Sequence, residues 1–542
     1  MQTLKRGQEN LEQAEDRLFN FRPLLFFALF FILGIVFKAL RQTQQVSNGV
    51  LWLFLLFLFP LALSESWKRF RRVCLGILVL VFAFSLGGRL FERQTQKFAE
   101  CTYYQGEYVV GGRVTKLQKY DDTICLTLDK ITIDKAKGKC KLVAYLPASY
   151  EAIVQISDEV LLIGQVTTDA RILDGDALRS YEIEKNAPYR LYAQECVVTG
   201  RSANVFLRIR QKLGEVIYKG MDETPSSVAT AILTGDTDGI GEGLLANIRY
   251  GGIAHIFAVS GLHIGALYAF CVWLMQKGKL YRIHGVYRFL MVALVLLFYG
   301  GICGYSASVV RAIVTCLALY GTKLIGIGDD ISERLALAGI IVLSISPVSL
   351  YSVGFQLSFS ACLGIAWLSR PIRNACFKLI GVNSKPQDDK PFTIWQSTYR
   401  GAISFLAVTL SAQLATAPIL YCAFGYLSGW GLLLNCIFVP LLSLIFSFLL
   451  LTAFLACLCS GLAGVILYVP NLMLSLALFV FETVDFSSFI LTGLITTSSS
   501  VVAYYVALLF ITDKWNVSAV VCRIFSCCFF ALCFTSLLVA NL

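Results

Sequence analysis

The chain contains repeated apolar windows, each close to the length that crosses a lipid bilayer. About 20 apolar residues span the roughly 30 Å of hydrocarbon in a membrane. About eleven or twelve such windows occur along the 542 residues. Hydrophobic residues make up 57% of the chain and charged residues 15%, and the mean hydropathy is +0.69, so a soluble globular protein is excluded. The sequence therefore predicts a polytopic α-helical membrane protein.

The first three windows set the expected orientation, and the three transmembrane helices that they predict are assigned to residues 23–90. They cover Phe21–Leu40, Val50–Leu63 and Val73–Leu90. Basic residues precede the first window and separate the second from the third, whereas Arg41 stands alone after the first. Because cytoplasmic loops carry an excess of Lys and Arg, residues 1–22 are expected in the cytoplasm and the third span is expected to end outside. A small-residue cleavage site is missing, so the first window does not read as a cleavable signal.

Residues 101–200 form a polar stretch that this orientation places outside the membrane. Alternating patterns such as YVVGGRVTKLQ and TICLTLDKITID predict about five short strands. A small OB-like β-barrel suits five strands, since closure removes exposed edges. A small sandwich would give the same pattern.

A run of lysines near one hairpin is the candidate basic patch of this outer domain. It could contact phosphate or be an ordinary solvated turn, and it consists of Lys130, Lys135, Lys137, Lys139 and Lys141. The domain as a whole has 12 basic and 14 acidic residues, so a domain-wide footprint for nucleic acid is absent. The net charge of +11 for the whole chain reflects cytoplasmic loops and is no evidence for DNA binding.

Four of the 18 cysteines lie in the outer domain, where disulfides are permitted. At least one bridge, and its pairing, is left open among Cys101, Cys125, Cys140 and Cys196. No cysteine or histidine cluster has zinc spacing, so neither a metal site nor another cofactor is expected. Residues 201–251 follow as an amphipathic linker. Its helix at Val205–Tyr218 is expected either to lie in the membrane interface or to pack on the barrel or the bundle.

Within the predicted transmembrane domain, residues 252–540, polar residues gather at few places. Together with the stretch that leads into it, four polar segments stand out: Ala231–Leu267, Gly300–Val314, Tyr351–Ile365 and Ser411–Leu441. Polar and ionisable side chains at membrane depth are costly unless they face a protein interior or a water-filled cavity, which makes these segments candidates for a functional site. A broken helix is expected at Ser260–His263.

Seven residues of these segments are the candidates to line or support a conduit: His255, Ser260, His263, Arg311, Gln356, Gln413 and Asn435. Each also has a structural interpretation. The histidines could be hydrogen-bonded interior groups, and Arg311 could form an ion pair with Glu482 or Asp485. Gln356 and Asn435 could join helices by hydrogen bonds. Bases of a nucleic acid could stack on Phe257, Tyr305 and Phe355.

These segments together resemble the ComEC family of DNA-uptake channels. The resemblance covers roughly Ala231 to Leu441 and rests on LTGD, GIAHIFAVSGLHIG, the Arg-Ala step at Arg311, GFQLSFSA and AQLATAP. It implies a multi-pass protein of a bacterial plasma membrane that passes single-stranded DNA into the cytoplasm during natural transformation. It also implies a ComEA-like outer DNA receptor and a ComFA-like cytoplasmic ATPase as partners, besides membrane lipid. Whether the chain forms a homodimer is left open.

The chain departs from many members of that family at its C-terminal end. A metallo-β-lactamase-like domain, which those members carry, needs a His/Asp metal cluster, and this chain has three histidines. Any nuclease is therefore expected to be a separate polypeptide, and the chain is not expected to be an enzyme. Ser260 and His263 could form a nucleophile and base, but the GxSxG elbow is missing. A transporter of a smaller solute is the remaining alternative, and without a GxxxxGK[ST] loop its energy would come from an ion gradient or a partner.

Overall fold

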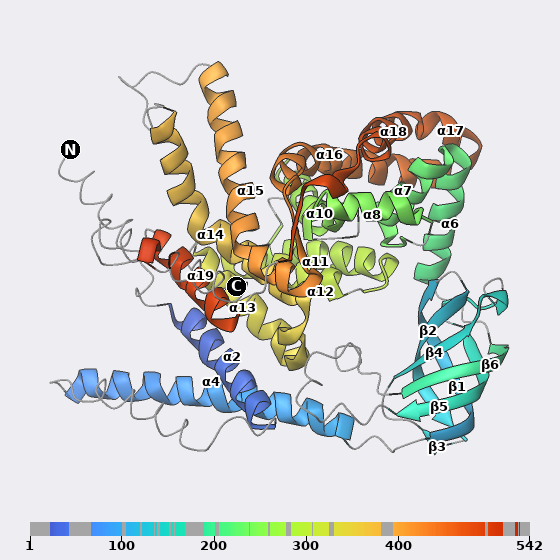
Figure 1. Ribbon diagram of the computed structural model, residues 1–542, viewed down its shortest axis with the longest axis horizontal. Coiled ribbons are helices and arrows are strands. Elements are labelled where there is room, and N and C mark those ends of the chain that lie inside the picture. Colours follow the sequence, from blue (N-terminus) through green and yellow to red (C-terminus); the bar gives the residue numbers. More distant parts are fainter. Residues whose placement is uncertain are drawn as a thin grey trace. The chain divides into compact units, whose positions relative to one another are not determined.

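The computed structural model describes most of the chain (Figure 1). The chain consists of two compact units. One unit comprises residues 1–23, 213–335 and 353–542, and the other comprises residues 24–212 and 336–352. The residues described are 22–42, 67–99, 105–119, 122–134, 136–137, 141–150, 153–156, 158–168, 189–200, 205–237, 239–257, 259, 261–277, 283–305, 307–324, 330–380, 394–493, 497–512, 526–528 and 531.

Two helices of the second unit, α2 (Pro23–Gln42) and α4 (Trp67–Ala99), cross at three glycines. A side chain at Gly34 would collide with the carbonyl oxygen of Phe84, and one at Gly87 would collide with that of Phe31. Gly88 faces the Lys38 side chain. Small residues permit this close approach of two backbones, which is the usual way in which apolar helices associate in a membrane.

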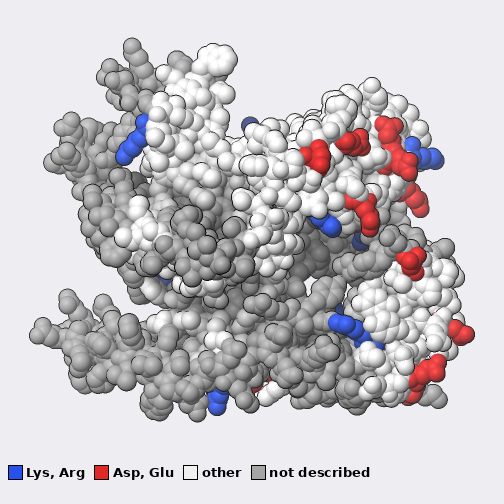
Figure 2. Space-filling view, viewed as in Figure 1, with Lys and Arg blue, Asp and Glu red and all other residues white. Residues whose placement is uncertain are grey.

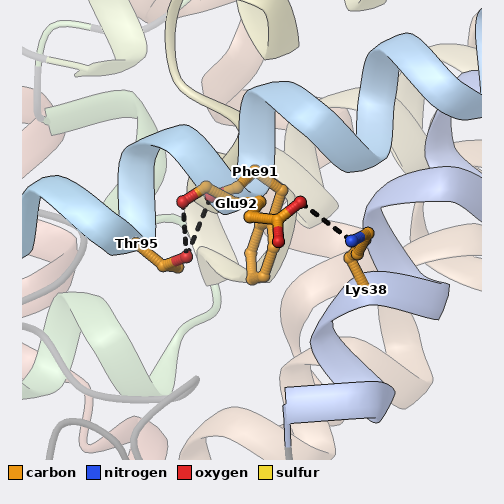
Figure 3. Close-up of polar contacts among 4 residues, drawn as sticks. All are labelled: Lys38, Phe91, Glu92 and Thr95. Atoms are coloured by element: carbon orange, nitrogen blue, oxygen red, sulfur yellow. Dashed lines mark hydrogen bonds and ion pairs between the residues drawn. The ribbon is translucent and has the colours of Figure 1, made fainter. Parts of the chain in front are cut away.

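An ion pair joins the same two helices beside the crossing. The ammonium of Lys38 on α2 donates to Glu92 Oε2 on α4 at 2.8 Å (Figure 3). The Thr95 hydroxyl donates to the carbonyl oxygens of Phe91 and Glu92, one turn back on α4. Because both charged side chains are partly exposed, the pair contributes modestly to stability, and the glycine contact sets the crossing.

The polar stretch of this unit folds into a closed five-stranded barrel, which confirms the expected strand number. Its main strands are β1 (Gln105–Lys119), β2 (Thr123–Ile133), β4 (Leu142–Pro147), β5 (Glu159–Thr168) and β6 (Tyr189–Gly200). The order β1-β5-β6-β4-β2 closes by pairing of β1 with β2, and only β4 with β6 is parallel among these strands. The arrangement is consistent with an OB-like barrel.

Alternation of side chains along the strands fills the barrel interior. Val110, Val114, Leu126 and Leu162 point inward and are fully or almost fully buried. The alternation is clearest at the start of β6, whereas Ile124–Leu128 of β2 are buried at five consecutive positions. A short strand β3 (Ala136–Lys137) pairs with the end of β2, and Asp134, which directly follows β2, has a positive φ of 45°.

The first unit is helical, and its residues 216–316 and 434–486 share one apolar core. Its helices are α7 (Glu223–Thr234), α8 (Glu242–Tyr250), α9 (Ala254–Phe257), α10 (Gly261–Lys277), α11 (Gly285–Ile302), α12 (Ala307–Leu324), α14 (Val353–Leu379), α15 (Ile394–Phe424), α16 (Gly431–Leu458), α17 (Ala463–Ile466), α18 (Tyr468–Thr483) and α19 (Ser498–Ile511). Short strands β7 (Tyr426–Ser428) and β8 (Ile490–Thr492) pair beside them. The helices α6 (Val205–Gly220) and α13 (Ile331–Ile345) each continue from one unit into the other.

Four described helices are long and apolar enough to cross a membrane: Pro23–Arg41, Gly285–Ile302, Trp395–Phe424 and Gly431–Leu458. The bent pair of Ser460–Ile466 and Tyr468–Thr483 would add a fifth span. The prediction of eleven or twelve spans also counted windows outside the described residues, such as the one at residues 50–63. The multi-pass class is supported, and the larger count stays a prediction.

The linker helix α6 makes contacts at both of its ends. Near its start, Gln211 donates to the side chain of Gln155 in the barrel at 3.2 Å. Near its end, Val216 and Ile217 are buried in the core of the bundle. Packing of this kind is the alternative that the sequence left open beside an interfacial position.

Candidate functional site

The first polar segment begins at the end of α7. Gly235 closes this helix in a left-handed conformation with φ of 80°, and its N–H donates to the carbonyl of Ala231 at 2.9 Å. A glycine is favoured here because other residues pay a steric cost at positive φ. The LTGD motif is therefore a helix stop.

The same segment then breaks between two helices. α9 ends at Phe257 and α10 begins at Gly261, with Val259 non-helical between them. The chain therefore breaks as expected but earlier than predicted, because Gly261–His263 of the expected segment Ser260–His263 already belong to α10. Ser260 lies outside the described residues. His255 on α9 is exposed. His263 on α10 is fully buried, and its ring lies 4.6 Å from that of Phe446.

The first three polar segments contact one another in order. The hydroxyl of Ser308 on α12 donates to the carbonyl of Val259 at 3.1 Å. The guanidinium of Arg311, one turn further along α12, lies over Gly354 at the start of α14. A Cβ placed on Gly354 would lie 3.2 Å from Nη2 and 3.4 Å from Nη1 of that arginine. The first segment thus touches the second, and the second touches the third.

The fourth segment completes a closed cycle of contacts. The hydroxyl of Ser360 on α14 donates to the carbonyl of Ala415 on α15 at 3.0 Å. A Cβ on Gly252, in the first segment, would lie 3.0 Å from Cβ of Ser428 and 3.2 Å from Cα of Gly431. Segments that lie up to about 190 residues apart in sequence therefore form one continuous site.

Each of the four polar segments also contains the first residue of a long helix. These helices are α10, α12, α14 and α16, and contacts at successive positions show that α10 and α12 run in the same direction. Along α10 and α12, Gly261 faces Ala312 and Tyr268 faces Tyr320. Arg311 on α12 lies over Gly354 at the start of α14.

The contacts of α16 with the first segment lie at two places. Gly252, which precedes α9, lies against Gly431 at the start of α16, whereas His263 near the start of α10 lies against Phe446 in the middle of α16. The N-terminal ends of α10 and α12 lie on one side of the bundle. These ends carry unsatisfied N–H groups and a partial positive charge.

Arg311 is 8% exposed, and its guanidinium joins the second segment to the third at Gly354. The carboxylate of Asp485, one of its two expected partners, accepts hydrogen bonds from the backbone N–H and hydroxyl of Ser487 at 2.9 and 2.8 Å. The backbone bond, followed by the hydroxyl bond, lowers the pKa of Asp485. An ion pair of Arg311 with Asp485 or Glu482 stays a prediction.

The three predicted amides occupy different positions. Asn435 is buried on α16, and its Nδ2 donates to the carbonyl of Gly431 at 2.7 Å. Gln413 on α15 also reaches that glycine, since a Cβ on Gly431 would lie 3.0 Å from its Nε2. Gln356 is half-buried in the first turn of α14, two residues after Gly354. The bond from Asn435 lies within its own helix, so it does not show the interhelical role considered for this residue.

The rings of two of the three aromatic candidates pack against other aromatic rings of the protein. Phe257 is almost fully buried and meets Phe481 edge-on, and Phe355 is stacked on Phe359 with ring centroids 4.3 Å apart. Tyr305 is exposed, although its hydroxyl donates to the carbonyl of Leu297 at 2.9 Å. Tyr305 is therefore the aromatic candidate that a ligand could reach.

The candidate residues of the barrel are partly described. Lys130 is exposed, Lys141 is half-buried, and the backbone of Lys137 pairs in β3, while Lys135 and Lys139 lie outside the described residues. Among the cysteines, Cys125 is buried in register with Tyr145, and Cys196 is a free thiol in the barrel core. Cys101 and Cys140 lie outside the described residues, so a bridge that involves them stays a prediction.

The bundle also carries an acidic surface, where carboxylate atoms gather over α7, α8 and α18 (Figure 2). A cleft of about 500 Å³ lies there between α8 and the end of α18, and its lining includes Glu482 and Asp485. Negative side chains make this cleft unsuitable for a polyanion. Within the described part of the chain, no group of His, Cys, Asp or Glu side chains is arranged to hold a metal ion.

Sequence reasoning missed several polar residues that organise the site. Asn247 on α8 donates to the carbonyls of Phe481 and Val484, both at 2.6 Å, and accepts from the N–H of Phe486 at 2.9 Å. Ser308 and Ser360 join segments of the contact cycle. A lone polar residue in an apolar run was the signal available, but it does not reveal the distant partner.

Comparisons of the sequence with known proteins identify the family of the chain. A family model described as "Competence protein" matches residues 232–517, more than half of the chain. ComE operon protein 3 of Bacillus subtilis (strain 168) is 27% identical over 218 residues, which cover 40% of this chain and 24% of that relative. The alignment thus spans about a quarter of the relative's length, and no solved structure matches the chain significantly. The chain belongs to the Competence protein family, and it is a membrane protein of the ComEC type.

Proposed function

We propose that this protein forms a membrane conduit that passes single-stranded DNA from the cell exterior into the cytoplasm during natural transformation. The observation that carries the proposal is the closed contact cycle of the four polar segments, which contain the first residues of α10, α12, α14 and α16. The family match supports a role in competence DNA uptake.

The helix N-termini within the polar segments suit a polyanion. Each N-terminus is equivalent to roughly half a positive charge, and its N–H groups can donate to phosphate oxygens. Arg311 adds one full charge at the start of α14. Together these groups would replace part of the hydration that DNA phosphates lose on leaving water, without a lining of many buried lysines.

The expected orientation places this region at the outer mouth of the conduit. Basic residues at the C-terminal ends of α10 and α14, such as Lys277 and Lys378, belong on the cytoplasmic side by the positive-inside rule. The N-terminal ends of the same helices then face outward, and the barrel lies outside. The exposed side chains of His255 and Tyr305 are the candidates to meet an arriving strand first.

The proposal requires partners that supply capture, strand degradation and energy. We assign these tasks to a ComEA-like DNA receptor, a separate nuclease and a ComFA-like ATPase, and we propose that the chain itself is not an enzyme. The plasma membrane of a bacterium is the proposed location.

The test is uptake of labelled DNA into a fraction that external nuclease cannot reach. Cells would carry the wild-type chain, a deletion, Arg311→Ala, or Lys277→Ala as a control that removes an exposed cation from the other end of α10. Loss of hydrogen bonds to a charged group costs about 1.5–3 kcal/mol, so we expect Arg311→Ala to reduce internalised DNA at least about tenfold at equal membrane levels. We expect the control to transport normally.

The outcomes separate the proposal from its alternative. DNA that stays bound outside in the deletion and in Arg311→Ala cells supports the conduit. Normal internalisation in the deletion strain contradicts it and favours a transporter of a smaller solute. Equal losses in Arg311→Ala and Lys277→Ala would remove Arg311 from the conduit.

A further inference from the structure

A second, separate hollow lies between α14 and α15, far along both helices from the contact cycle. The two helices are antiparallel: Gly364 lies against the backbone of Ser411, and Phe377 lies against Arg400. Near the C-terminal end of α14 they leave a pocket of about 310 Å³. Six residues line it: Arg373, Asn374, Phe377, Arg400, Gly401 and Ser404.

The lining of this pocket suits an anion. Two guanidinium groups and one amide can donate to it, and of the six described lining residues none is acidic. The guanidinium of Arg400 lies 5.0 Å above the centre of the Phe377 ring, which restrains its orientation. A Cβ on Gly401 would meet no atom within 4 Å, so the absence of a side chain there keeps the pocket open. Lys and Arg side chains are visible on the surface near the C-terminal end of α14 (Figure 2).

The lengths of the two helices place the pocket at the surface of the bilayer. α14 has 27 residues and α15 has 31, which at 1.5 Å per residue gives about 40 and 46 Å. α15, which is one of the candidate spans, exceeds the roughly 30 Å of hydrocarbon, so its first turns, which lie beside the end of α14, reach the headgroup layer. The basic residues Arg370, Arg373 and Lys378 assign these ends to the cytoplasmic leaflet.

Large apolar side chains close in sequence to the lining residues are exposed. Leu379 is 86% exposed, Ile380 is 62% exposed and Trp395 is 83% exposed. Trp and Tyr side chains are enriched at the membrane interface, and Tyr399 is also exposed here. A nucleic acid would leave these apolar side chains in water, whereas lipid chains would cover them.

We propose that this pocket binds the phosphate headgroup of an anionic phospholipid of the cytoplasmic leaflet. Arg373 and Arg400 hold the phosphate oxygens, Asn374 donates to the headgroup, and the acyl chains lie against Leu379 and Ile380. Basic pockets between transmembrane helices on the cytoplasmic side are suited to such headgroups. The site is independent of the proposed DNA path.

The test measures lipid binding to the purified full-length protein by native mass spectrometry. Phosphatidylglycerol and phosphatidylcholine are titrated in parallel, and inorganic phosphate and a single-stranded oligonucleotide are added as competitors. Arg373→Gln removes a donor pair, and Gly401→Leu fills the pocket without changing its charge. Lys277→Gln removes an exposed charge of the same predicted membrane side outside the pocket.

We expect phosphatidylglycerol to bind the wild-type protein at least about tenfold more tightly than phosphatidylcholine, as charge-assisted hydrogen bonds imply. Both pocket variants should lose about that factor, while Lys277→Gln and excess inorganic phosphate should have little effect. Arg373→Lys, which keeps the charge, separates loss of binding from misfolding. Unchanged binding in both pocket variants, or an equal loss in Lys277→Gln, overturns the proposal. Displacement of the lipid by the oligonucleotide, with oligonucleotide binding lost in both variants, would assign the pocket to nucleic acid.

Discussion

The hydroxyl of Tyr299 on α11 donates a hydrogen bond of 2.9 Å to the carbonyl oxygen of Leu233 near the end of α7. Both residues are buried, and the thiol of Cys303 reaches the same oxygen at 3.6 Å. The last carbonyls of a helix have no partner within it. Tyr299 therefore supplies from another helix the donor that the end of α7 lacks.

Tyr299→Phe should destabilise the bundle by about 1–2 kcal/mol, because it leaves a buried carbonyl with a weaker partner. Thermal unfolding of the purified protein in detergent would measure the loss. Tyr305→Phe is the matched control: its hydroxyl also donates to a backbone carbonyl, but the side chain is exposed, so water can replace it. Equal effects of the two substitutions would contradict the role of burial.

Gly354→Val should impair DNA internalisation while the protein still reaches the membrane. The new side chain would enter the space of the Arg311 guanidinium, which lies 3.2 Å from the Cβ position, and would displace it from the contact cycle. Gly265→Ala on α10 is the control, since its Cβ position is open. Nuclease-protected DNA would be counted in both strains. Normal uptake with Gly354→Val would show that the position of Arg311 does not matter.

Gly87→Leu should disrupt the crossing of α2 and α4. Its side chain would collide with the backbone of Phe31, and overpacking of this kind costs about 1–3 kcal/mol or more. Gly76→Leu changes a glycine of the same helix whose Cβ position is open, and it should be tolerated. The membrane level and the thermal unfolding of the two variants test the contact, and similar values would refute it.

Cys196 should resist alkylation at neutral pH. Burial, aided by the charge of Asp158, raises the pKa of this thiol from 9.0 to about 11, and the thiolate is the reactive form. Brief iodoacetamide treatment over a range of pH, followed by mass spectrometry of the peptide that contains Cys196, would give its labelling rate. Rapid labelling at pH 7 in the native protein would contradict the buried position.

The same shift predicts how the stability of the barrel depends on pH. The folded barrel holds the thiol proton more tightly than the unfolded chain does, so this contribution to stability is complete below pH 9. It declines as the pH rises toward about 11, because the unfolded chain then releases the proton first. Cys196→Ala should remove that decline from the denaturation profile of the full-length protein.

The local patterns in the sequence anticipated several elements correctly. Alternation of apolar and polar residues from Gln105 to Gly200 predicted the five strands, because each strand of a small barrel has one buried face. The cluster of glycine and polar residues before His263 predicted the break that separates α9 from α10. Both features depend on neighbours in the chain, which a single sequence records.

Other features of the site depended on distant neighbours and could not be predicted. Phe257 and Phe355 suggested stacking platforms, yet Phe481 and Phe359 occupy their rings. Asn247 was not among the predicted site residues, although it forms hydrogen bonds with three backbone groups more than 230 residues away. A polar residue in an apolar run has to find a partner, but the pattern does not say where.

By itself, the sequence determined that this is a membrane protein with a small β-domain and four polar segments, since hydropathy and alternation are properties of consecutive residues. Only the tertiary structure decided that Ser308 meets Val259, that Arg311 lies over Gly354, and that Gly252 packs against Gly431. These contacts follow from which helix faces approach closely and in which direction the helices run. Packing of backbones through glycine and small polar residues, which hydropathy does not encode, sets that choice.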